Sequence, residues 1–246
     1  SRKATVWQQK FSKILSIPIR YLLLGGVLLL VILWIKSQAI NFNEHNRYSL
    51  DLREISSLDA RIKQNVLQAR DGLLTYYDPI VNDLAEVKQL HSNLEQVPSF
   101  VDRQGREELE GILQSDRSIW QKKELIIQRF QSENAILRNS LTYFPIAIAD
   151  LVEKETIDPA LVNRLQTLLR NILLFNLSND RELVPPINNE IQELLALSAT
   201  TAESEKLKMT LAHAKIIMSR YSQVNDWVQT IIALPTNQSS ENLIQA

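Results

Sequence analysis

Apolar residues recur every three or four positions along almost the whole chain after residue 36, which is the spacing of amphipathic helices. No stretch of six residues alternates apolar and polar positions as a strand would. The pattern therefore predicts an all-α protein. Long helices are expected over about 37–77, over about 103–144 and at the end of the chain, and shorter ones over 79–96, 146–154, 159–177 and 187–199.

Prolines mark the turns between these helices. The residue before a proline avoids helical backbone angles, so Asp78-Pro79, Pro98 and Pro145 each predict the end or interruption of a helix. Proline also fits the first helical position, so Asp158-Pro159 predicts a helix start with the aspartate as N-cap. A further break is expected at 184–186, and the last helix should end at Pro235.

The lengths of the predicted helices indicate how they are arranged. Because long helices of about 40 residues reach about 60 Å, two of them cannot pack along their full length in one compact four-helix bundle. The lengths predict two bundles stacked end to end that share their long helices.

The last helix has the most regular pattern of apolar positions. Two sets of positions seven residues apart interleave as an a/d heptad seam: Leu207, Ala214, Tyr221 and Val228 with Leu211, Met218, Asn225 and Ile232.

The N-terminal region has the features of a membrane anchor. Residues 21–35 contain no charged side chain, and Arg20 and Lys36 flank them, so 21–36 is predicted to be a transmembrane helix continuous with the first long helix. Residues 1–20 carry five bases and no acid, which predicts a cytoplasmic tail and places residues 37–246 outside. A cleavable signal peptide is the alternative, because Ser37-Gln38-Ala39 loosely fits a cleavage site.

Composition excludes several classes of function. The net charge is −1, and the 226 residues after the basic tail carry −6, so a nucleic-acid-binding surface is not expected. The chain has no cysteine, and His45, His91 and His213 share no metal-ligand spacing. Five glycines leave almost no material for phosphate-binding loops, and no nucleophile motif occurs. We therefore predict no catalytic residue, no metal and no cofactor in this chain.

Polar side chains beside the apolar stripes of two helices are the candidate binding residues. A polar group inside a bundle needs a partner, because burial without one costs about 1–3 kcal/mol. One interpretation is that Arg70 pairs with Asp71, Asp78 or another acid and fixes helix register. The other is that these groups line a small-ligand pocket, with arginine for an anionic group. The candidates are Arg70, Tyr76, Tyr77, Asp78, Asn134, Arg138 and Asn139.

Two runs that contain these candidates resemble the double all-α-helical ligand-binding (DAHL) domain. They are residues 66–81 (VLQARDGLLTYYDPIV) and residues 130–145 (FQSENAILRNSLTYFP). Gln131 departs from the family pattern, where a lysine is expected before the serine. The resemblance covers roughly residues 40–244. It implies the extracytoplasmic sensory region of a bacterial membrane receptor, commonly a sensor histidine kinase, whose catalytic part would belong to a cytoplasmic half outside this chain.

The resulting hypothesis is a ligand-sensing input domain that turns binding into small helix displacements across the bacterial inner membrane. The alternative is a membrane-anchored helical scaffold that recruits another protein. The expected partners are the membrane, an unknown small molecule or periplasmic protein, and a second protomer, with no nucleic acid. A homodimer could form through the heptad seam, unless the protomer's own bundle uses it, or through Leu50, Leu52 and Ile55 on the first helix.

The charge asymmetry generates a prediction about topology. A reporter enzyme that works only outside the cytoplasm should be active when it is fused after residue 60. The reason is that the basic residues before the uncharged run retain the N-terminus in the cytoplasm, so the chain after that run lies outside. Activity at that position of a reporter that works only in the cytoplasm would contradict the assignment.

Overall fold

The computed structural model describes residues 19–38, 42–99, 101–153, 157–199 and 203–236, and this part of the chain contains helices and no strand. The prediction of an all-α fold is therefore confirmed. In chain order the elements are α2 (Ile19–Gln38), α3 (Phe42–Arg70), α4 (Asp78–Leu94), α5 (Arg103–Val152), α6 (Pro159–Ser178), the 3-10 helix η1 (Arg181–Leu183), α7 (Val184–Ser198) and α8 (Ser204–Ala233).

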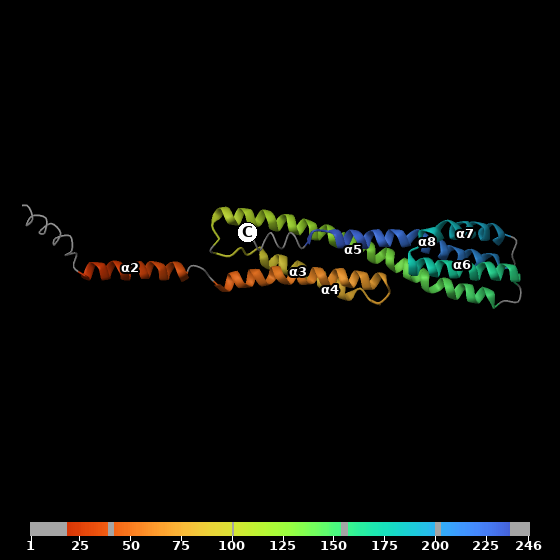
Figure 1. Ribbon diagram of the computed structural model, residues 1–246, viewed down its shortest axis with the longest axis horizontal. Coiled ribbons are helices and arrows are strands. Elements are labelled where there is room, and N and C mark those ends of the chain that lie inside the picture. The colour runs from red at the N-terminus through yellow and green to blue at the C-terminus, as the bar shows by residue number, and fades with distance from the viewer. Residues whose placement is uncertain (1–18, 39–41, 100, 154–156, 200–202, 237–246) are drawn as a thin grey trace, which may run out of the picture.

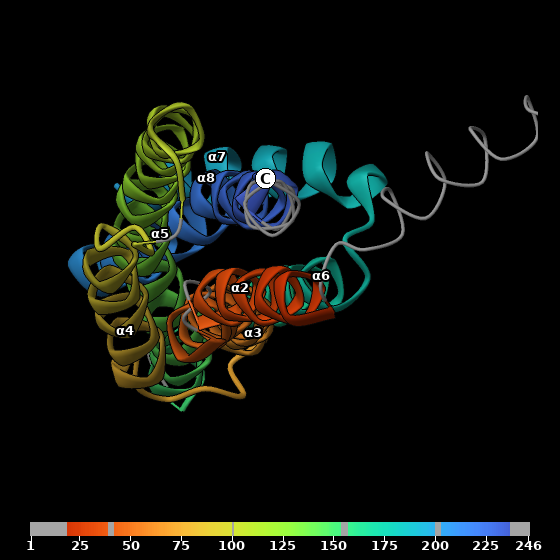
Figure 2. The same cartoon turned by 90° about the vertical axis from the view of Figure 1, so that its left-hand side faces the viewer.

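The helices form two bundles that share α5 and α8, as the helix lengths predicted (Figure 1). α3 and α4 pack on one half of the shared pair, and α6 and α7 pack on the other half. Viewed along the long axis, α3, α4, α5 and α8 are arranged around a common axis in the bundle that contains α3 and α4 (Figure 2). We call the bundle with α3 and α4 the proximal bundle and the one with α6 and α7 the distal bundle.

The first long helix ends earlier than predicted. α3 stops at Arg70 instead of continuing to Tyr77, because Gly72 adopts a left-handed conformation with φ of 77°. The amide of Leu73 donates to the carbonyl of Gln68 at 2.8 Å, and that of Gly72 donates to Ala69 at 3.2 Å, which closes the helix end. Leu73 has helical spacing in the sequence but is 77% exposed. Spacing alone therefore overextended the helix.

Pro145 does not end the second long helix, so the separate helix predicted over 146–154 is wrong. α5 passes through Pro145 and continues to Val152. An interior proline costs about 3 kcal/mol because it removes one hydrogen bond and crowds the preceding turn. Burial of Phe144, Ile148 and Leu151 in one continuous stripe supplies the compensating free energy.

The helix starts predicted at Pro79 and Pro159 are confirmed, whereas the break predicted at 184–186 lies earlier, over residues 179–183. α4 begins at Asp78 with Pro79 in its first turn, and the Asp158 carboxylate accepts from the amide of Ala160 at 3.0 Å at the start of α6. α7 begins at Val184, three residues before the predicted start, because prolines are tolerated in a first turn that needs no amide partner.

The heptad seam of α8 packs inside the protomer's own bundles, and one of its two sets of positions differs from the prediction. Leu207, Leu211, Ala214 and Val228 are buried as the heptad predicts. Ile217, Val224 and Ile231 are buried in place of their neighbours Met218, Asn225 and Ile232. The second set therefore lies three residues after the first, not four, and it keeps the seven-residue repeat of a heptad.

The membrane prediction gains no support from the helices. Among the residues that the structure describes, none forms a helix both long enough and apolar enough to cross a bilayer. The predicted continuity of α2 with α3 falls on residues 39–41, which lie outside the described residues. The span over 21–36 stays a prediction.

A buried polar cluster ties the proximal bundle to the end of α8. Lys123 on α5 forms an ion pair with Asp59 on α3, and both are inaccessible to solvent. The hydroxyl of Thr236, just after α8, donates to Asp59 at 2.7 Å, and Lys63 contacts the other carboxylate oxygen at 2.7 Å. Burial lowers the pKa of Lys123 to about 8 although Asp59 favours its charged form. Three segments therefore depend on one buried pair.

Replacing Lys123 with methionine tests this cluster. Lys123→Met should lower the free energy of unfolding by about 3 kcal/mol, because it leaves the Asp59 carboxylate buried with fewer partners. Lys122→Met is the matched control, since Lys122 is the exposed neighbour on the same helix and its loss should change stability by less than about 0.5 kcal/mol. Urea unfolding measures both. Equal effects of the two substitutions would show that the buried pair does not fix the bundle.

Candidate functional site

The two sequence runs that resemble the sensor family meet where the proximal and distal bundles join. Asn134 on α5 is buried, and its side-chain amide donates to the carbonyl of Ala69 at 3.1 Å and to the hydroxyl oxygen of Tyr77 at 3.0 Å. Burial raises the pKa of Tyr77, while Asn134 and Arg138 oppose the shift, so the phenol stays protonated at neutral pH. Asn134 thus clamps the end of α3 and the loop that follows onto α5.

Arg138 lies one turn further along α5, against the backbone of Gly72. A Cβ atom added to Gly72 would stand 2.2 Å from a terminal nitrogen of Arg138. Glycine is favoured at this position chiefly by its positive φ, and a larger side chain would also displace the guanidinium of Arg138. The turn after α3 is shaped to receive Arg138.

A cavity of about 540 Å³ opens beside this turn, and we call it the junction cavity. Five elements surround it: the end of α3, the middle of α5, the end of α6, the 3-10 helix η1, and α8. Its charged lining residues are Arg70, Asp71, Arg138, Arg181 and Asp226. Both bundles contribute side chains, so a molecule bound here would contact the two bundles at once.

The arginines of the junction cavity differ in their pairing. Arg70 is held by Asp71, with its Nε and terminal nitrogens 2.8 Å from one carboxylate oxygen. Arg138 and Arg181 form no ion pair within the described part of the chain. Unpaired guanidinium groups in a polar cavity suit a planar anionic group such as a carboxylate, which accepts two parallel hydrogen bonds.

The seven predicted site residues separate into three groups. Arg70 and Arg138 line the junction cavity. Tyr77 and Asn134 do not line it but brace the turn beside it. The remaining three do not line it and point to solvent, Tyr76 with 72% of its surface exposed: Tyr76, Asp78 and Asn139. Arg70 pairs with Asp71, one of the acids considered for it, and this pair joins adjacent residues at the end of α3 without linking a second helix.

Sequence reasoning missed the lining that comes from α6, η1 and α8. Asn179 ends α6 in a left-handed conformation with φ of 52°, and the next turn carries Arg181 to the cavity. Tyr221 on α8 donates its hydroxyl to the carbonyl of Asn176 at 3.3 Å and so fixes this corner. Two features of the sequence could have pointed to this lining. Ser178-Asn179-Asp180 is typical of a turn, and Asn225 is a polar residue at a core-type heptad position.

No cluster of three or more histidine, aspartate or glutamate side chains suited to a metal ion occurs in the part of the chain that the structure describes. The junction cavity is lined by three guanidinium groups, two carboxylates, several amides and the phenol of Tyr221, groups that can hold a polar ligand by hydrogen bonds and charge.

Comparison with known protein families agrees with the family resemblance of the two sequence runs. A model of the DAHL-domain family matches residues 40–246, which confirms the resemblance. No solved structure matches the chain.

If the junction cavity is one site, the costs of losing its two arginines should be coupled. We expect Arg70→Ala with Arg138→Ala to destabilise the protein by at least about 0.5 kcal/mol more than the two single changes together. Each single change also relieves the repulsion between two like charges in one cavity, whereas the double change relieves it only once. Arg164 is the control, since it pairs with Glu190 and Glu193 within the distal bundle. Arg70→Ala with Arg164→Ala should be additive within about 0.5 kcal/mol in urea unfolding. Additivity of both pairs would separate Arg70 from Arg138.

Proposed function

The chain belongs to the DAHL-domain family of helical sensor domains, and on that premise we propose that it is the ligand-sensing input region of a transmembrane signalling receptor. The receptor class that fits best is a bacterial sensor histidine kinase, with catalysis in a cytoplasmic part. A DAHL domain is not itself catalytic.

The junction cavity is the observation that carries this proposal. It is large enough for a small metabolite and has two unpaired arginines, Arg138 and Arg181, that come from different parts of the fold. We propose that the ligand is a small organic anion that these guanidinium groups bind together. A scaffold that only recruits another protein would have no use for such a cavity, so the cavity favours sensing over the alternative function.

Signal transfer follows from the position of the cavity. Arg138 is on shared helix α5, Arg181 is in the distal bundle, and Arg70 ends proximal helix α3. A ligand that draws these groups together favours one packing of the two bundles over another, because it binds that packing more tightly. Displacements of about 1–2 Å between packed helices are a common form of such switching. α3 follows α2 in the chain and would carry the displacement toward the membrane.

We propose that α2 anchors the protein in the bacterial inner membrane over residues 21–36, with residues 1–20 cytoplasmic and the bundles outside. The basic tail and the uncharged run support this placement. The described apolar side chains of α2, such as Leu23, Leu30 and Trp34, are exposed and pack on neither bundle, which would suit a lipid environment.

We also propose a homodimer, but fewer residues are available for its interface than the sequence indicated. The α8 seam is used by the protomer's own bundles. Leu52 and Ile55 are buried in the proximal core, so of the three α3 residues considered only Leu50, 62% exposed, is free for a second protomer. We propose that tethering by α2 in the membrane supplies the high local concentration that so small a contact needs.

A thermal-shift screen of the full chain against small organic acids tests the function. A ligand at 100 times its Kd stabilises the folded state by about 2.7 kcal/mol, which corresponds to a rise in Tm of about 5–10 °C. Arg138→Gln should weaken binding about 10-fold to 100-fold, because it removes charge-assisted hydrogen bonds.

Arg103→Gln is the matched control for this screen. Arg103 is an exposed arginine at the far end of the same helix, and its loss should leave binding unchanged. The proposal fails if no anion raises Tm, or if Arg138→Gln and Arg103→Gln affect binding equally.

A further inference from the structure

The outer face of α5 carries a line of exposed residues, which we call the α5 seam. Its members lie four, three, four and three positions apart: Ser132, Ile136, Asn139, Tyr143 and Ile146. The three large apolar members expose 40%, 53% and 51% of their surface. Alternating steps of three and four residues place side chains in one line along a helix, which is the spacing of a helix–helix contact. The buried stripe on the other side of α5 packs in the protomer's own core.

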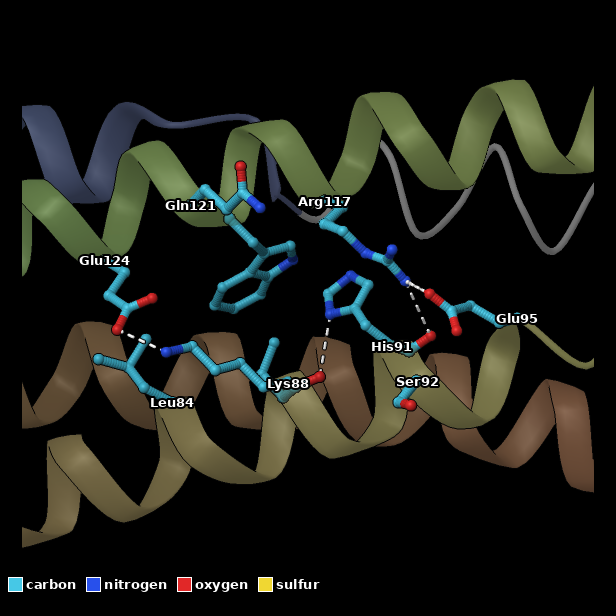
Figure 3. Close-up of a pocket in the computed structure, with 10 residues that line it drawn as sticks. Leu84, Lys88, His91, Ser92, Glu95, Arg117, Gln121 and Glu124 are labelled. Atoms are coloured by element: carbon cyan, nitrogen blue, oxygen red, sulfur yellow. Dashed lines mark hydrogen bonds and ion pairs between the residues drawn. The ribbon is translucent and has the colours of Figure 1, made fainter.

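The α5 seam lies between the two flanks of α5 that neighbouring helices occupy. On one flank, Glu124 pairs with Lys88 of α4 at 2.7 Å, as Figure 3 shows. On the other flank, Glu133 pairs with Arg220 of α8 at 2.8 Å. At 3.6 residues per turn, the line of seam residues falls between these two flanks on the solvent side. The part of the chain that the structure describes therefore leaves the seam open to solvent.

The surroundings of the α5 seam carry no exposed charge. The exposed residues of α5 between positions 131 and 149 are all uncharged, and the two charged residues in this range, Glu133 and Arg138, are half-buried. The solvent-facing side of a helix ordinarily carries charged residues. A second copy of the same face can meet this one without like-charge repulsion. The electrostatics of the seam therefore suit self-association.

Asn139 indicates which molecule covers the α5 seam. Its side chain is exposed, and it lies in the middle of the seam between Ile136 and Tyr143. A carboxamide has both donors and acceptors, so it can pair with an identical carboxamide. A single polar residue in the seam between two identical helices fixes their register at some cost in stability. Asn139, which does not line the junction cavity, thus has a role if the same helix of a second copy lies against it.

The membrane anchor sets the direction of such a contact. α5 runs along the long axis of the molecule from the proximal to the distal bundle (Figure 1). Two protomers anchored by α2 in one membrane are related by a two-fold axis along that direction, so their α5 helices lie parallel. In a parallel pair identical residues face each other, and each Asn139 side chain meets its own copy.

We propose that the α5 seam is the homodimer interface, with α5 of a second copy packed parallel to it and the two Asn139 carboxamides hydrogen-bonded to each other. This inference rests on the homodimer of the proposed function and assigns it a surface. The seam extends about 21 Å from Ser132 to Ile146, which is short for a stable interface, so the contact depends on tethering in the membrane. Because α5 also carries Arg138, a ligand that displaces α5 acts on both protomers.

Single cysteines test the α5 seam directly, because the chain has no cysteine of its own. In the full chain in lipid vesicles, Asn139→Cys should give a disulfide-linked dimer with copper–phenanthroline, since a disulfide forms where two Cβ atoms approach to about 4 Å. Asn189→Cys is the matched control, because Asn189 is an exposed asparagine on α7, which packs on α6 and α8. It should cross-link at least about tenfold more slowly. Leu50→Cys reports on a homodimer that uses α3 instead.

Asn139→Asp tests the same contact without a cross-link. The substitution keeps the shape of an exposed side chain but places two carboxylates opposite each other, which repel and cannot pair as carboxamides do. It should weaken dimerisation in lipid vesicles at least about tenfold, measured by energy transfer between labelled protomers as the vesicles are diluted with lipid. Asn189→Asp should leave dimerisation unchanged.

The outcomes separate the α5 interface from the homodimer itself. Equal cross-linking rates at Asn139→Cys and Asn189→Cys would reveal random collision and overturn the inference, as would unchanged dimerisation of Asn139→Asp. If Leu50→Cys cross-links and Asn139→Cys does not, the α5 seam has another occupant and the inference is wrong, while the homodimer stands. If none of the three cysteines cross-links, the homodimer of the proposed function fails as well.

Discussion

The architecture depends on one constraint: α5 and α8 must stay packed against each other through both bundles. α5 has 50 residues and extends about 75 Å at 1.5 Å per residue. Its buried stripe runs without interruption from Leu109 in the proximal bundle to Leu151 in the distal bundle. Since a packed apolar stripe cannot shift at one end without repacking its neighbours, the two bundles are mechanically joined. The same stripe keeps α5 helical through Pro145.

The junction cavity is a consequence of the shared pair. α3 ends from one side and α6 from the other, and both ends turn through left-handed residues, Gly72 and Asn179. Between them α5 and α8 continue without flanking helices, and the lining there combines polar side chains with Leu137, Leu141, Leu177 and Val224. Arg138 fits against Gly72, and Asn134 secures the turn from the same helix. Ligand binding at this point would therefore change the packing of both bundles together.

The sequence pattern predicted those features of the fold that depend on residues close together in the chain. Proline chemistry gave the starts of α4 and α6, and apolar spacing gave the long helices and their division between two bundles. The same reasoning ended α5 too early, because the free energy that carries it past Pro145 comes from tertiary packing. That the runs around Arg70 and Arg138 contribute to one site could be predicted from their resemblance to one family. The contribution of Arg181 could not be predicted, since it depends on where the end of α6 lies in space.

Hydrogen exchange of the full chain measures the central claim, that the junction couples both bundles, most directly. Peptides would be compared between the wild type and Arg138→Gln. The account predicts faster exchange in the turn over residues 71–77, and also at the end of α6 and in α8 around Tyr221, because these segments surround one cavity. A change confined to residues 71–77 would contradict the account, since Arg138 would then stabilise a single turn and transmit nothing to the distal bundle.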